Sequence, residues 1–173
     1  YSTTYYANVY LTQNAIVSID QSNISDSYYY GVRLNNSTSG KTSQLSITSS
    51  IIQDNNNKGI YVYAVSGGLS LVNVTNCVIQ NNGNSGFDTI NVLGLTFNNY
   101  VLNNNAGYAA YLNLAGNAAP DLTGNSGLGN SKNGIALVGP IAADSNLTYL
   151  SDLVYIIPSS GWTINSGVTM TLP

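Results

Sequence analysis

Apolar residues recur along the chain at matching places in a repeat of about 21 to 28 residues. One glycine marks each repeat, and an apolar residue directly follows each of these glycines. The glycines are Gly31, Gly59, Gly86, Gly107 and Gly134. Twelve residues before these glycines stand Ile19, Ile47, Val74, Leu95 and Leu122, and seven before stand Ile24, Ile52, Ile79 and Tyr100. A period of this length with β-type alternation inside it is typical of stacked repeats rather than of a globular core.

Each repeat contains two or three short strands separated by polar turns. Alternation with period two places Leu45 and Ile60 inward and Tyr61 and Tyr63 outward. Since no helical pattern connects the strands, the coils must wind directly over one another, each adding about 4.8 Å of height. The sequence therefore predicts an all-β solenoid of about five to six parallel coils over residues 1–139, with essentially no α-helix.

The polar turn before each glycine is also regular. Four residues before the glycines stand Ser27, Asn55, Asn82 and Asn103. Asparagine tolerates the left-handed backbone conformation, and its amide can bond to the copies above and below. We expect a ladder of these side chains, after which the glycine supplies a positive φ as the chain enters the next strand.

Both ends of the chain read as strands without a capping helix. Residues 1–11 alternate from the start, and residues 146–157 and 162–172 read as strands beyond the regular coils. We therefore expect a C-terminal strand segment over residues 140–173 that joins neighbouring repeats or subunits. Either the chain is a slice of a longer array, or its copies associate end to end into a filament.

The stretch Ile47–Val62 carries the pattern I-x-x-S-x-I-x-x-N-x-x-x-G-I-x-V. It resembles the right-handed parallel β-helix superfamily of pectate lyases, polygalacturonases, phage tailspikes and surface adhesins. The resemblance covers roughly residues 15–139 and implies the architecture, because lyases, hydrolases, epimerases, adhesins and inert stalks share it. The last stretch, Trp162–Pro173, looks like the opening strand of a further repeat in large bacterial surface proteins.

Composition narrows the function classes. The chain has four Lys and Arg, seven acidic residues that are all Asp, no His and a net charge of −3. Phosphate binding needs clustered Lys and Arg, so nucleic acid is an unsuitable partner. No apolar run reaches the roughly 20 residues of a spanning helix. The surface rich in Asn, Ser, Thr and Tyr is typical of an extracellular or cell-surface protein.

Catalytic chemistry has few candidate groups. Without His, neither a Ser nor Cys77 has an ordinary general base, and Cys77 is expected to fill a small buried slot. Arg33 is expected to stack on Tyr61 rather than to act as a lyase base. We therefore expect a protein that is not an enzyme.

Asp26 and Asp54 should stack on consecutive coils, because both lie five residues before their glycine. Two carboxylates about 4.8 Å apart repel unless a proton or cation lies between them. The pair is thus a turn ladder in which Asp replaces Asn, a Ca²⁺ site or a catalytic dyad. No other cofactor is implied.

Surface chemistry gives two further sets of candidates. The expected contact face for sugar rings or another protein chain consists of Tyr28, Tyr29, Tyr30, Tyr61, Tyr63 and Tyr111. Cross-coil stacking that stabilises the sheet is the alternative role for these rings. Tyr63 and Tyr111 are expected to share one register. The glycosylation candidates are the sequons at Asn73, Asn35, Asn36, Asn23 and Asn146.

These features favour a structural or adhesive extracellular protein: a repeat rod forming part of a filament, stalk or surface layer, with glycosylation as an additional expectation. The alternative is a carbohydrate-binding or polysaccharide-lyase-like β-helix.

Overall fold

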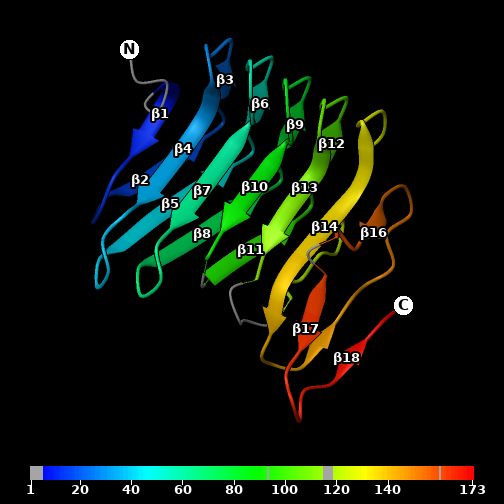
Figure 1. The fold of residues 1–173 in the computed structure, drawn as a ribbon. Helices are drawn as coiled ribbons and strands as arrows, with labels where there is room; N and C mark the ends of the chain where they lie inside the picture. The colour runs from blue at the N-terminus through cyan, green and yellow to red at the C-terminus, as the bar shows by residue number, and fades with distance from the viewer. Residues whose placement is uncertain (1–5, 93, 115–118, 160) are drawn as a thin grey trace.

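The computed structural model describes residues 6–92, 94–114, 119–159 and 161–173, so residues 1–5 of the expected first strand lie outside it. The described residues form β-strands and no α-helix, and the strands stack in successive coils of a solenoid of about six turns (Figure 1). The predicted all-β parallel fold is confirmed.

Each of the first four coils contributes one strand to each of three parallel sheets. Sheet A contains β1 (Ala7–Leu11), β4 (Tyr30–Asn36), β7 (Ile60–Ala64), β10 (Phe87–Ile90), β13 (Tyr108–Asn113), β14 (Lys132–Ile141), β16 (Val154–Ile156) and β17 (Trp162–Ile164). Sheet B contains β2 (Ile16–Asp20), β5 (Thr42–Thr48), β8 (Leu69–Thr75) and β11 (Gly94–Asn98). Sheet C contains β3 (Asn23–Ser25), β6 (Ile51–Gln53), β9 (Val78–Gln80) and β12 (Val101–Asn103). Near the C-terminus, β15 (Ser145–Asn146) pairs with β18 (Met170–Thr171).

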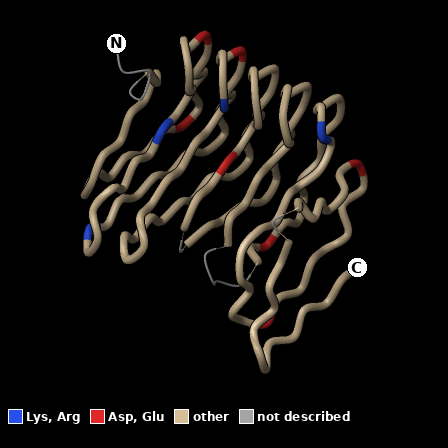
Figure 2. Tube along the Cα trace, in the orientation of Figure 1, with Lys and Arg blue, Asp and Glu red and all other residues tan. Residues whose placement is uncertain are grey.

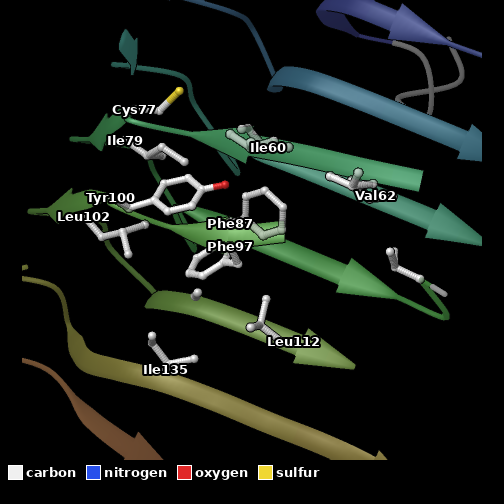
Figure 3. Packing of buried hydrophobic residues seen from close by; sticks show 14 of the residues in the cluster. Ile60, Val62, Cys77, Ile79, Phe87, Phe97, Tyr100, Leu102, Leu112 and Ile135 are labelled. Carbon is white, nitrogen blue, oxygen red and sulfur yellow. The ribbon is translucent and has the colours of Figure 1, made fainter. Parts of the chain in front are cut away.

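The core lies inside the coils, where like residues stack on like. Ile19 pairs with Ile47, and Ile47 pairs with Val74, as predicted. Burying such an aliphatic side chain contributes about 1.5–3 kcal/mol, so the column itself holds successive coils together. Cys77 fills a buried position beside this core, as expected, and Figure 3 shows it above Ile79.

The predicted register is wrong by two residues in the fourth coil. Phe97 pairs with Val74, and Leu102 pairs with Ile79, where Leu95 and Tyr100 were expected. The residue that takes the glycine place in this coil is Ala109, and Gly107 lies two residues earlier in the turn.

Aromatic packing explains this register better than the glycine does. The ring of Phe97 stacks on Tyr100 at 4.2 Å between centroids and meets Phe87 edge-on at 4.9 Å. All three rings are buried between the strands (Figure 3). The coil therefore takes the register that buries its large rings, since aromatic side chains dominate core energetics.

The predicted asparagine ladder is confirmed, with Asn105 in place of Asn103. The side chains of Asn55, Asn82, Asn105 and Asn130 are buried and bonded in series. Each Nδ2 donates to the Oδ1 of the next at 2.9 Å, and each Oδ1 also accepts from the backbone N–H of the coil before. The ladder satisfies turn groups that could not otherwise reach a partner inside the solenoid.

The glycines of the repeat do not supply the positive φ expected of them. A Cβ on Gly59 would lie 2.7 Å from the carbonyl oxygen of Gly86 and 2.7 Å from Cγ2 of Ile79. The glycine is therefore required by lack of space between coils. The left-handed conformation falls instead on Asp26, Asp54, Asn81 and Asn104, with φ between 53° and 60°.

The expected division at residues 139 and 140 falls inside strand β14. Residues 134–136 of that strand pair with β16, and residues 139–141 pair with β17. The C-terminal segment thus stacks on the preceding coil as a continuation of the solenoid, because β14 is long enough to seat both strands.

Candidate functional site

The outward side chains of sheet A form one continuous row across consecutive coils. The register pairs Tyr10 with Arg33, Arg33 with Tyr61, Tyr61 with Asp88 and Asp88 with Tyr111. We call these five residues the sheet A row. Their inward neighbours Val32 and Val62 are fully buried in the core, so the pleat directs the row to the outside of the coil.

Arg33 is the centre of an aromatic cluster on this face. Its Cζ atom lies 5.6, 5.4 and 5.8 Å from the ring centroids of Tyr10, Tyr30 and Tyr61. The expected stacking of Arg33 on Tyr61 is therefore found, with two further rings. The side chains cover one another so well that Arg33 is 8% exposed despite its outward position. Its Nε and Nη1 atoms are buried without a hydrogen-bond partner.

An ion pair lies on the other side of Tyr61. Lys58 Nζ contacts Asp88 Oδ2 at 2.7 Å and lies 4.0 Å from the Tyr61 ring centroid. Burial raises the pKa of Asp88, an effect that the attraction of Lys58 opposes. Burial also raises the pKa of Tyr61, and the Asp88 carboxylate adds to that shift. The Oδ1 atom of Asp88 is buried and unpartnered.

The six predicted tyrosines of the contact face occupy different environments. Tyr28 is 70% exposed, Tyr30 is buried, and Tyr29, Tyr61, Tyr63 and Tyr111 are half-buried. The prediction that Tyr63 and Tyr111 share a register is wrong, because Tyr111 lies in the row of Tyr61 after the shift in the fourth coil. Rings also pack on rings, as for Tyr30 and Tyr61 at 5.2 Å.

Asp26 and Asp54 follow the paired residues Ser25 and Gln53, so they lie on consecutive coils as expected. Both are exposed, and both have the positive φ that Asp and Asn tolerate. Within the described residues, no group of three His, Cys, Asp or Glu side chains is placed to hold a metal ion. The positive φ at both positions agrees with the turn-ladder alternative.

The five sequons differ in accessibility. Asn23, Asn73 and Asn146 are exposed, and Asn35 is half-buried with its Nδ2 donating to Tyr10 Oη at 3.1 Å. Asn36 is fully buried, and its Nδ2 donates to the carbonyl oxygens of Lys41 and Leu69 at 2.8 Å. Asn36 is therefore unsuitable as a glycan acceptor in the folded protein. It falls at an inward position of β4, two residues after Leu34, and pairs with the buried Ala64 of the next coil.

Comparison with protein families matches residues 2–141 to the model described as a right-handed β-helix region. The chain belongs to this family. Comparison with curated proteins and with solved structures gave no match. The resemblance noted from the sequence is thereby confirmed at the level of fold.

Membership of the β-helix family leaves the activity open, because β-helix domains occur in enzymes of the pectate-lyase type and in proteins without activity. In the described part of this β-helix there is no helix of the length and hydrophobicity needed to cross a membrane. Charged residues are few and spread over the coils rather than gathered into a patch of one sign (Figure 2).

Sequence reasoning missed three members of the site. These are Tyr10, Lys58 and Asp88, to which the sequence analysis assigns no role. The signal was present in the repeat: Asp88 lies two residues after Gly86, the same offset as Arg33 from Gly31. What the repeat could not show is that Lys58 reaches across one coil to Asp88.

Proposed function

We propose that this β-helix is a structural repeat rod of an extracellular or cell-surface assembly, and that it stacks end to end on further coils. The observation that carries the proposal is the open core of the first coil. Val17 and Ile19 point inward but are only half-buried, whereas Leu45 and Ile47, which pair with them in the next coil, are 1% and 0% exposed.

The other end of the solenoid has a similar surface. Trp162, Val168 and Met170 pack against the core but stay half-buried, and Val154 and Leu172 are each 60% exposed. Apolar surface at both ends, and edge strands that have no further partner strand among the described residues, favour association with another coil. A contact that joins unlike ends does not close and so extends into a rod or filament.

Negative-stain electron microscopy and light scattering over a range of concentrations test this proposal. We expect rods that lengthen with concentration. Val17→Asp places a charge on the open end and should abolish them, whereas Ser18→Asp places the same charge on the outward face of the same strand and should not. Circular dichroism checks that both variants fold. Monomers at every concentration for the wild-type chain would overturn the proposal.

The extracellular location is supported by the scarcity of Lys and the absence of Glu, and by three exposed sequons. Asn73 is the best placed of these, since it faces outward on β8 between Val72 and Val74, which are 3% and 0% exposed. Intact mass of protein secreted from its native source tests the glycans. We expect additional hexose mass that Asn73→Gln reduces, and an unmodified mass would contradict this part of the proposal.

A further inference from the structure

Unpartnered polar atoms lie in one patch of sheet A, made by Arg33, Tyr61 and Asp88 with Lys58. Eight buried side-chain polar atoms in the described residues lack a hydrogen-bond partner, and three of them belong to Arg33 and Asp88. A buried donor or acceptor without a partner costs free energy that folding alone does not recover. Such a concentration of unpaired groups indicates a surface whose hydrogen bonds are completed by something that binds.

The charge of the patch indicates what binds. Asp88 is already paired with Lys58, whereas Arg33 is a buried cation that lies against three tyrosine rings and whose Nε and Nη1 have no hydrogen-bond partner. The patch therefore has one uncompensated positive charge in a protein of net charge −3. A carboxylate is the group that fits the planar guanidinium best.

The aromatic rings favour a polypeptide over a saccharide. Sugar rings bind on free aromatic faces, but here cations already lie over the rings of Tyr10, Tyr30 and Tyr61. Tyrosine and arginine are the residues that most often anchor protein interfaces. Arg33 and Asp88 are two strands apart, about 9.6 Å, which is close to three residues of an extended chain.

We propose that the sheet A row binds an extended acidic polypeptide segment that runs along the solenoid axis. One Asp or Glu carboxylate of the segment pairs with Arg33. An N–H group about three residues away donates to Asp88 Oδ1. Because the free nitrogens of Arg33 are covered, the half-buried ring of Tyr61 turns aside as the carboxylate enters. This site is independent of end-to-end stacking.

Arg33→Met tests the proposal, because it keeps the length of the side chain and removes the cation. Binding of a fluorescein-labelled peptide rich in Asp and Glu is measured by anisotropy at low and high salt, beside the thermal midpoint of each variant. Lys41→Met is the matched control, since it removes an exposed cation from the loop before β5. A parallel assay uses polygalacturonate.

We expect the wild-type protein to bind the peptide more weakly as salt rises, and Arg33→Met to weaken binding about tenfold or more, as for loss of a charged hydrogen bond. Lys41→Met should bind as the wild type does. Arg33→Met should also melt at the same or a higher temperature, because an unpaired buried cation has been removed. A purely structural Arg33 would give a lower midpoint with unchanged peptide binding. That result, absence of peptide binding, or binding of polygalacturonate alone would overturn the proposal.

Discussion

The asparagine ladder provides the most direct test of what holds the coils in register. Asn82 occupies its centre and is 1% exposed. Its Oδ1 accepts from the backbone N and the Nδ2 of Asn55, at 3.2 and 2.9 Å. Its Nδ2 donates to Asn105 Oδ1 at 2.9 Å and to the carbonyl oxygen of Ile52 at 3.4 Å. Asn82→Ala removes all four hydrogen bonds.

The expected loss of stability in Asn82→Ala follows from the hydrogen-bonding groups that are left without a partner. The N–H and Nδ2 of Asn55 become buried donors without an acceptor, and each such group costs about 1–3 kcal/mol. The remaining two bonds contribute about 0.5–1.5 kcal/mol each. We therefore expect Asn82→Ala to lower the free energy of unfolding by about 3–9 kcal/mol, a large share of the roughly 5–15 kcal/mol of a typical domain.

Urea unfolding followed by circular dichroism measures this loss. The matched control is Asn56→Ala, an exposed asparagine of the neighbouring coil's turn, for which we expect a change within about 0.5 kcal/mol. If Asn82→Ala and Asn56→Ala differed by less than about 1 kcal/mol, the ladder would not stabilise the coils and the reasoning would be refuted.

Three further predictions concern single buried groups. Burial raises the pKa of Asp88. Above pH about 4, the unfolded chain releases the carboxyl proton while the folded state still keeps it. The free energy of unfolding therefore falls as the pH rises from about 4 through the folded-state pKa of Asp88. Asp88→Asn should flatten this part of the profile of urea midpoint against pH, and parallel profiles would contradict it. Cys77 is 1% exposed and burial raises the pKa of its thiol, so a thiol reagent should label it only after denaturation, and rapid labelling of the native protein would contradict its placement. The Tyr100 hydroxyl is buried without a partner, so Tyr100→Phe should stabilise the protein by about 1 kcal/mol, seen as a higher thermal midpoint; a lower midpoint would show that the hydroxyl is satisfied.

Most of the fold could be predicted from the spacing of residues along the chain. In a solenoid, each coil contacts its neighbours at a nearly constant sequence separation, so that Ile19, Ile47 and Val74 could be aligned by counting. The ladder was predictable for the same reason. Counting failed in the fourth coil, where the ladder step from Asn82 to Asn105 is 23 residues instead of the 27 from Asn55 to Asn82.

The candidate site was predictable only in part. The offset from the glycine placed Arg33 beside Tyr61, because neighbouring coils align residue by residue. It did not show that Tyr10 and Tyr30 enclose the guanidinium, since a ring's direction depends on side-chain rotamers. The burial of Asn36 was within reach of the sequence, since the alternation that puts Val32 and Leu34 inside also puts Asn36 inside.

The chain's repeat alone determined that this protein is a parallel β-helix with polar turns and an aliphatic core, because a period-two pattern recurring at each coil has no other way to bury its apolar face. The tertiary structure decided the register of the fourth coil and which charged side chains on sheet A have an ionic partner. The physical reason is that both depend on packing between side chains from different coils. The rings of Phe87, Phe97 and Tyr100 select one register. Lys58 pairs with Asp88, while Arg33 lies against tyrosine rings with two nitrogens that have no hydrogen-bond partner.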